Sequence, residues 1–124
     1  MRRVGLPKDA ALADSAAAVV PGTRIPAFLE IAADGKVRLL SPFVEGGHGI
    51  AIGMAQIVGE ELDVDPESFE VVCAPPGPDY LVVGGIRKTG GSFSTRSSYP
   101  VMRQLGATAR EMLLRAAPAR MQVP

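Results

Sequence analysis

The chain has 124 residues, which favours a single domain with one ordinary hydrophobic core. Its 13 basic and 13 acidic residues give a formal net charge of zero, so no basic excess supports binding to a nucleic-acid backbone. Apolar residues make up 47% of the chain, yet no apolar run approaches the length of a membrane-spanning helix. We therefore expect no nucleic-acid partner and no membrane span.

The chain has one cysteine and one histidine, which excludes an internal disulfide and a closed zinc site. Cys73 lies in the apolar run FEVVC, where a buried strand cysteine that packs as a small hydrophobe is expected. We expect no metal ligands from the protein.

The first residues show no sustained hydrophobic periodicity and end in a cluster of turn formers, VPGTRIP. We predict a flexible N-terminal extension over residues 1–25 and a partial cofactor-type domain over residues 26–124. Lys8, Asp9 and Asp14 interrupt the stretch that a secretory signal would need to be apolar.

Residues 27–42, AFLEIAADGKVRLLSP, predict two strands joined at Asp34 and Gly35, a pair suited to a tight hairpin turn. Apolar residues at helical spacing then predict an amphipathic helix over residues 50–62. The stretch SFEVVCA, residues 68–74, predicts a third strand.

The last helix is expected from about Ser98 to Ala117. Pro100 is tolerated only near a first turn, so the helix should begin near Ser97 or Ser98, unless an earlier turn from Ser94 is kinked there. Its expected buried stripe is Leu105, Ala109, Met112, Leu113 and Ala116. The element order β-β-α-β-α predicts an α+β fold, with a small mixed or antiparallel sheet covered by two helices.

Two glycine-rich stretches, VEGGHG and KTGGSFS, each precede a helix. A helix N-terminus exposes unpaired N–H groups and the positive end of the peptide dipole, which suits an anion. Thr89, Ser92 and Ser94 add three hydroxyls that can bond phosphate-type oxygens. Plain capping and tight packing explain such glycines equally well. Neither stretch matches the phosphate loop of nucleotide hydrolases, because no lysine follows the glycines.

Glu45 is a candidate general base, but a single carboxylate without a partner defines no reaction.

Six motifs follow one another between about Ala27 and Ala117: AFLEIAADGKV, VEGGHG, IVGEELDVD, FEVVCAPPGPDY, KTGGSFS and VMRQLGATAREMLLRAA. In this order and spacing they resemble the beginning of the large, molybdopterin-binding subunit of the xanthine dehydrogenase/aldehyde oxidase family. The most similar branch is the isoquinoline 1-oxidoreductase beta-subunit type.

The resemblance implies that the two glycine-rich loops help to bind a molybdenum–molybdopterin cofactor. The positions that match the family's cofactor-binding segments are Gly47, His48, Gly49, Thr89, Gly90, Gly91, Ser92, Phe93 and Ser94. It also implies hydroxylation of an N-heterocycle or oxidation of an aldehyde, with electrons leaving through an iron–sulfur subunit.

Two departures from the family pattern stand out. His48 occupies a position where the family usually has glutamine, and an imidazole can titrate near neutral pH. The family subunit is also several times longer, and the glutamate that acts in its chemistry lies far downstream of any motif matched here. We therefore expect a fragment or split subunit that is inactive alone, with its catalytic residues unknown.

Such a piece would require the remaining molybdenum-subunit segments and an iron–sulfur subunit as partners, or would self-associate through apolar surface. Two other function classes stay open: a non-catalytic domain for partner docking or anion binding, and a nucleotide- or phosphate-binding module. The compartment also stays open. The missing signal favours the cytoplasm, whereas similar enzymes are often exported folded to the periplasm.

Overall fold

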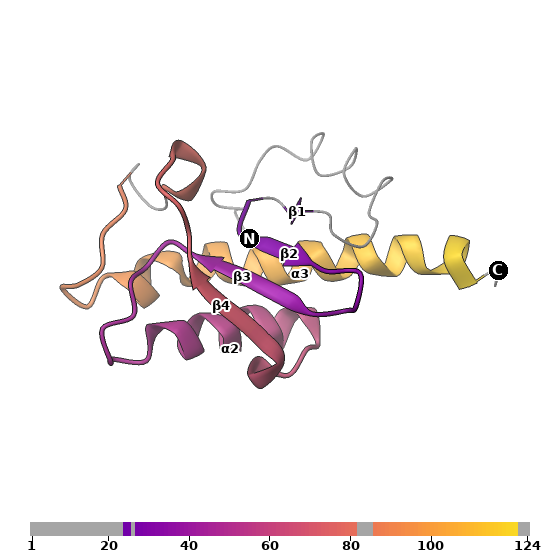
Figure 1. Cartoon of the computed structure of the whole chain (residues 1–124), viewed down its shortest axis with the longest axis horizontal. Helices are drawn as coiled ribbons and strands as arrows, with labels where there is room; N and C mark the ends of the chain where they lie inside the picture. The colour runs from indigo at the N-terminus through magenta and orange to yellow at the C-terminus, as the bar shows by residue number, and fades with distance from the viewer. Residues whose placement is uncertain (1–23, 26, 82–85, 122–124) are drawn as a thin grey trace.

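The computed structural model of the chain describes residues 24–25, 27–81 and 86–121. Its sheet has four strands, in the order β1 (Arg24–Ile25), β2 (Leu29–Ile31), β3 (Val37–Ser41) and β4 (Phe69–Cys73). The pairs β1–β2 and β2–β3 are antiparallel, whereas β3–β4 is parallel. The sheet is therefore mixed, and the predicted α+β fold is confirmed; the predicted β-β-α-β-α order follows one further strand, β1, that was not predicted (Figure 1).

The hairpin between β2 and β3 turns where the sequence predicts it. Gly35 has a φ of 85°, in the left-handed region that favours glycine. The Asp34 side chain accepts a hydrogen bond from the backbone N–H of Lys36 at 3.1 Å. Ile31 and Val37 form the last pair of the ladder before this turn.

The helix α2 (Ile50–Leu62) lies between β3 and β4 in the chain, so it forms the crossover that a parallel strand pair requires. The C-terminal end of α2 has a specific structural cause. Asp63 adopts the left-handed conformation, and the N–H groups of Asp63 and Val64 both bond to the Gly59 carbonyl. A short 3-10 turn, η1 (Pro66–Ser68), then leads into β4. A second such turn, η2 (Pro78–Tyr80), follows β4.

The last helix, α3 (Ser94–Met121), is longer at both ends than predicted. The alternative start at Ser94 forms, and not the one near Ser97 or Ser98: a first turn lies ahead of Pro100, and the Ser97 N–H bonds to the Phe93 carbonyl at 2.9 Å. Pro100 removes one hydrogen bond within the helix. The burial of Val101 and Met102 offsets this loss.

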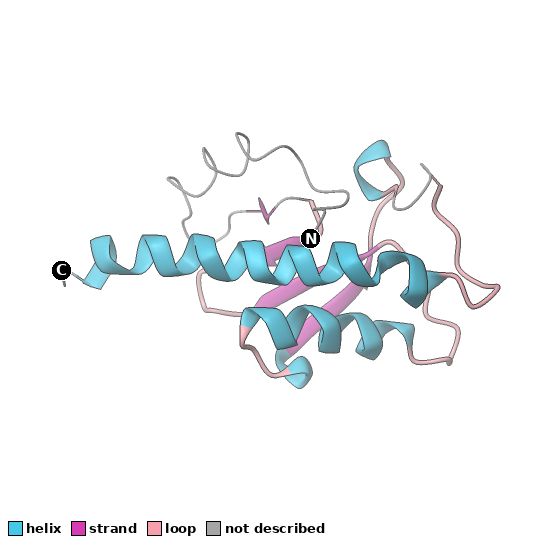
Figure 2. Cartoon of the chain, turned by 180° about the vertical axis from the view of Figure 1, so that it is seen from behind, coloured by secondary structure: helices cyan, strands magenta, loops and turns pink. Residues whose placement is uncertain are grey.

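Both helices lie on the same face of the sheet (Figure 2). The residues at the centre of this layer are apolar and fully buried: Leu29, Leu39, Met54, Val58, Met102 and Leu105. The predicted stripe of α3 is confirmed for Leu105, Ala109 and Met112, which are buried, and for Leu113, which packs against the core, whereas Ala116 is only half-buried.

The two helices approach closely at Gly106 of α3. A Cβ atom on this residue would lie 2.5 Å from the backbone oxygen of Val58 in α2, which is closer than real contacts allow. Glycine at this position therefore sets the distance between the helices.

Most of the predicted N-terminal extension lies outside the described residues. Its last two residues, Arg24–Ile25, form β1 and pair with Glu30 and Leu29. The division of the chain at residue 26 stays a prediction. Within the described ranges, no helix is both long enough and apolar enough to cross a membrane.

Candidate functional site

The two glycine-rich loops lie at the same end of the molecule in both views (Figures 1 and 2). The first loop (residues 44–49) joins β3 to α2, and the second loop (residues 88–93) leads into Ser94, the first residue of α3. The carboxyl end of the parallel pair β3–β4 faces this end, the edge where α/β sheets commonly bind ligands. The fold therefore brings together residues that are about 45 positions apart in sequence.

One hydrogen bond joins the two loops directly. The backbone N–H of Val44 donates to the Thr89 hydroxyl oxygen at 3.0 Å. Both residues are solvent-exposed, so the bond lies at the surface between the loops. Thr89 keeps its own hydroxyl proton for a second partner.

Within the first loop, the Glu45 carboxylate is held by three backbone N–H groups. Its Oε1 accepts from Gly47 at 2.7 Å and from Gly49 at 3.1 Å, and its Oε2 accepts from Ala51 at 2.9 Å. Gly47 and Gly49 have φ values of 88° and 80°, which place their N–H groups on one side of the turn at no steric cost. The carboxylate thus supplies an anion to the N-terminus of α2 from within the chain.

These contacts stabilise the charged form of Glu45. The hydrogen bond from Ala51 is the largest cause, followed among the lowering causes by those from Gly49 and Gly47 and by the nearby His48; partial burial opposes them. Together they lower the pKa of Glu45 from 4.5 to about 2. A carboxylate with so low a pKa and with both oxygens engaged is a poor proton acceptor near neutral pH. The structure thus replaces the general-base candidacy of Glu45 with a role inside the loop.

His48 sits on the same loop with its ring half-exposed. Its Nδ1 accepts a hydrogen bond from the Gly46 N–H at 3.3 Å and lies 3.6 Å from Oε1 of Glu45. Among the described residues, no group is in hydrogen-bond contact with Nε2 of His48.

The second loop makes a tight turn in which three successive residues have positive φ: Gly90 at 130°, Gly91 at 64° and Ser92 at 51°. The Phe93 N–H closes it by bonding to the Gly90 carbonyl at 3.2 Å. Such successive left-handed residues point backbone N–H groups to one side and form a small concave surface that suits an anion.

The hydroxyls that were predicted to face a ligand divide into two kinds. Ser94 is buried, and its Oγ approaches the Lys88 carbonyl at 3.5 Å, so it holds the loop together. Ser92 is exposed on the turn and has no hydrogen-bond partner within the described part of the chain. The half-buried Phe93 anchors the turn at its end.

The sequence analysis missed Arg87, which fixes the entry to the second loop. Its guanidinium donates to the carbonyl oxygens of Pro42 at 2.7 Å, Pro75 at 2.8 Å and Ala74 at 2.6 Å. One Nη also lies 3.2 Å from the Sγ of Cys73. Arg87 therefore ties the ends of β3 and β4 to the second loop, and no sequence motif signals this.

Cys73 itself was expected to be buried, and this is wrong. It is the last residue of β4, the edge strand of the sheet, and it is exposed, with the Arg87 guanidinium beside its thiol. Lys88 was also missed: its Nζ lies 4.0 Å from the position that a Cβ on Gly91 would occupy, so a positive charge stands beside the turn.

The space beside both loops is open. Cβ atoms built on Gly47 and on Gly90 would meet no atom within 4 Å. The loops thus present backbone N–H groups, an exposed hydroxyl and an ammonium group next to free space. This donor set fits the phosphate and pterin parts of a molybdopterin. Among the described residues, no group of three or more His, Cys, Asp or Glu side chains is placed to hold a metal ion.

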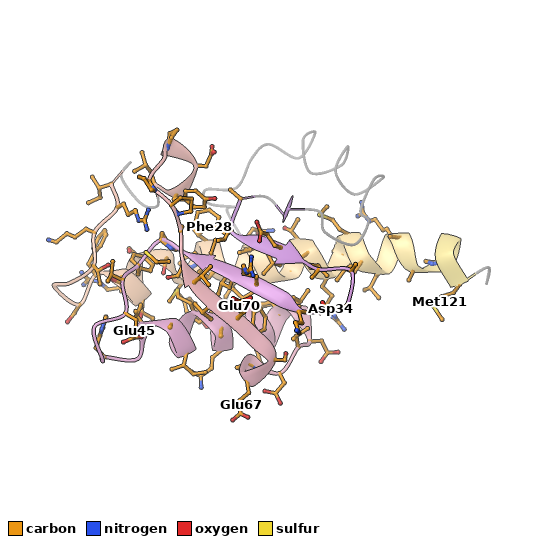
Figure 3. The ribbon with its side chains drawn as sticks, viewed as in Figure 1. Phe28, Asp34, Glu45, Glu67, Glu70 and Met121 are labelled. Carbon is orange, nitrogen blue, oxygen red and sulfur yellow. The ribbon has the colours of Figure 1, made fainter. Side chains whose placement is uncertain are left out.

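Figure 3 shows Glu45 well apart from Asp34 of the β2–β3 hairpin, with Met121 of α3 lying beyond Asp34. The hairpin therefore offers positions for control substitutions away from the loops.

Comparison with known proteins places the chain in a family. The profile of the molybdopterin cofactor-binding domain matches residues 10–124. The chain is also similar to the isoquinoline 1-oxidoreductase subunit beta of Brevundimonas diminuta, with 35% identity over 115 residues. This match covers 89% of the chain and 14% of the relative's length, so the chain spans a small part of that protein. The chain belongs to the molybdopterin cofactor-binding domain family.

Proposed function

We propose that the chain is part of a molybdenum hydroxylase, in which its two loops contribute to one molybdopterin site. The enzyme would hydroxylate an N-heterocycle or oxidise an aldehyde. When bound, the cofactor supplies the redox chemistry, and the protein supplies binding, orientation and hydrogen bonds. The cofactor-binding residues would be Gly47, His48, Gly49, Thr89, Gly90, Gly91, Ser92, Phe93 and Ser94.

The hydrogen bond between Val44 and Thr89 is the observation that carries this proposal. Two loops that each precede a helix, separated by 45 positions in the chain, are in direct contact at 3.0 Å. A single large ligand can therefore contact both loops at once. Two turns that only cap their own helices would not need to contact each other.

The second loop is the better candidate for the anionic part of the cofactor. Its turn offers backbone N–H groups, the Ser92 hydroxyl and the nearby ammonium group of Lys88. Ser94 and Arg87 would hold the turn in shape through their bonds to backbone carbonyls.

The remaining segments of the molybdenum subunit and an iron–sulfur subunit are the partners that this function requires. The similar protein of Brevundimonas diminuta is an oxidoreductase subunit, which supports assembly with other chains. The base that the reaction requires would come from those segments, because the Glu45 carboxylate is engaged within its own loop.

The test uses the chain co-expressed with the rest of its molybdenum subunit and the iron–sulfur subunit. Molybdenum and pterin are measured in the purified complex, for the native chain and for Gly91→Val and Gly47→Ala. Gly91→Val should abolish cofactor retention, because a β-branched side chain is strained at a φ of 64° and crowds the turn. Gly47→Ala should lower retention several-fold, since its methyl group would occupy the open space beside the first loop.

Gly35→Ala is the matched control. Gly35 has a φ of 85°, close to the 88° of Gly47, and a Cβ on either residue meets nothing within 4 Å. Both substitutions therefore carry a similar backbone strain of about 1–2 kcal/mol. Only the loop variants should lose cofactor. Equal retention in all three folded variants would contradict the loop assignment.

A non-catalytic domain for partner docking or anion binding is the second candidate function. His48 stands where similar enzymes have glutamine, which favours this reading. A complete complex that contains neither molybdenum nor pterin would support it over the molybdenum hydroxylase.

A further inference from the structure

The first loop differs from the second loop in one respect: its backbone N–H groups already have an anion. The N–H groups of Gly47, Gly49 and Ala51 all donate to the Glu45 carboxylate. A ligand anion could use them only by displacing a carboxylate that forms part of the same loop. Three charge-assisted hydrogen bonds, formed without any loss of translational freedom, make this displacement unfavourable.

The neighbouring N–H group, that of Gly46, has a different acceptor. It donates to Nδ1 of His48 at 3.3 Å. Nδ1 therefore carries a lone pair, and the proton of the neutral imidazole lies on Nε2. Glu45 does not compete for this position as a hydrogen-bond acceptor, because its Oε1 is 3.6 Å from Nδ1 and already accepts two hydrogen bonds.

We propose that Glu45 is a positioning residue: its carboxylate is the built-in anion of the first loop and presents His48 to an incoming ligand as the Nε2–H tautomer. By fixing the N–H groups of Gly47 and Gly49, which flank His48 in the chain, Glu45 orients the Gly46 N–H toward Nδ1. The two loops then have different roles in binding a ligand. The first loop offers a directed side-chain donor, and the second loop offers the backbone cradle.

This division rests on the proposed function for the identity of the ligand, but the arrangement of the loop does not. It is tested on the full chain without cofactor, by nuclear magnetic resonance of the ¹⁵N-labelled protein. His48 is the single histidine of the chain, so its ring signals are assigned without ambiguity. The expected result is a protonated Nε2 and an unprotonated Nδ1 in the neutral ring. A predominant Nδ1–H tautomer would overturn the proposal.

Hydrogen exchange of the loop amides distinguishes Glu45 from His48 as the organising residue. In Glu45→Gln, the amides of Gly46, Gly47, Gly49 and Ala51 should all exchange about tenfold or more faster, because the neutral side chain accepts fewer and weaker hydrogen bonds. The Gly46 N–H donates to His48 and not to the Glu45 carboxylate, so its faster exchange would report an effect transmitted through the loop.

In His48→Ala, only the Gly46 amide should exchange faster. If all four amides lose protection in His48→Ala, His48 organises the loop and the proposal is wrong. Unchanged exchange in a folded Glu45→Gln variant would also overturn it. Glu60→Gln, on the exposed side of α2, removes the same charge without touching the loop and should change none of these signals.

A measurement on the native chain covers the case in which Glu45→Gln does not fold. On acidification, the amide signals of Gly47, Gly49 and Ala51 should shift together with a midpoint near 2, the pKa of the carboxylate that they share. Independent titration of the three signals would overturn the proposal. His48 is the one other ionisable group that acts on this carboxylate in the described part of the chain.

These outcomes are separable from those for the proposed function. The exchange and tautomer measurements are made without cofactor, so they test the positioning role of Glu45 independently of the proposed function. A complex without molybdopterin would remove the proposed function and leave the loop arrangement unaffected.

Discussion

Individual side chains at the functional end of this protein mostly bind backbone groups of their own chain. Glu45 accepts from three amides, and Arg87 donates to three carbonyl oxygens. Charged groups that would be candidates for chemistry in the sequence are thus engaged in holding two loops in shape. Ser92, Lys88, the Thr89 hydroxyl and Nε2 of His48 are side-chain donors that these contacts leave available in the two loops.

The stability of the chain should depend on pH through Glu45. The pKa of this carboxyl is about 2 in the folded chain and 4.5 at its ordinary value, so the folded state binds the proton less readily than the unfolded state does. The stabilisation is therefore fully present above about pH 4.5 and is lost as the pH falls through about 2. Urea unfolding of the native chain and Glu45→Gln should show a difference in midpoint that shrinks over this range.

Glu60→Gln is the control for this comparison, because Glu60 is exposed on α2 outside the loop. Its midpoint should follow that of the native chain throughout. A Glu45→Gln difference that stays constant from pH 5 down to about 2 would contradict the assigned role.

At the scale of elements, two glycines of the helices differ in the space that a side chain would find. Gly106 has none, whereas Gly53 has open space beside it. Gly106 lies in the contact, where a Cβ would come within 2.5 Å of the Val58 oxygen and 2.9 Å of the Glu61 Cβ. Gly53 is within α2, and a Cβ there would meet nothing within 4 Å. The same substitution should therefore have opposite effects at the two positions.

Gly106→Ala should destabilise the chain by about 1–3 kcal/mol, because the helices must separate to admit the methyl group. Gly53→Ala should stabilise it by about 0.5–1 kcal/mol, because alanine loses less backbone entropy in a helix. Thermal or urea unfolding measures both. A neutral Gly106→Ala would show that the contact is looser than the structure indicates.

At the scale of the whole molecule, the mixed sheet determines where the loops meet. The parallel pair β3–β4 sends both of its carboxyl ends toward one edge, and α2 and α3 begin at that edge (Figure 1). The Val44–Thr89 bond and the Arg87 contacts then connect the loops there.

The chain alone should turn over no N-heterocycle or aldehyde. It spans 14% of the length of its relative, and the Glu45 carboxylate is engaged within its own loop. Activity should appear on co-expression with the remaining molybdenum-subunit segments and an iron–sulfur subunit, as measured by substrate oxidation with an artificial electron acceptor. Turnover by the 124 residues alone would refute the shared-site view.

The sequence by itself determined the helices and three of the four strands, in their order, but not the short strand β1. The Asp34–Gly35 turn, the apolar period of α2 and the buried stripe of α3 are local patterns, and each forms where it is predicted. The family resemblance could also be recognised from the sequence, because several motifs occur together in one order and spacing. The sequence pattern did not decide where α3 begins. A turn ahead of Pro100 is stabilised by packing that no local pattern reveals.

Only the tertiary structure decided what the charged residues do. Whether Glu45 is a base or a built-in anion depends on where three N–H groups point, and this follows from the positive φ values of Gly47 and Gly49. Arg87 likewise finds its carbonyl partners only once β3 and β4 lie side by side. The Arg87 bonds join residues distant in sequence, and the Glu45 bonds depend on the backbone angles of one loop. A one-dimensional pattern contains neither geometry.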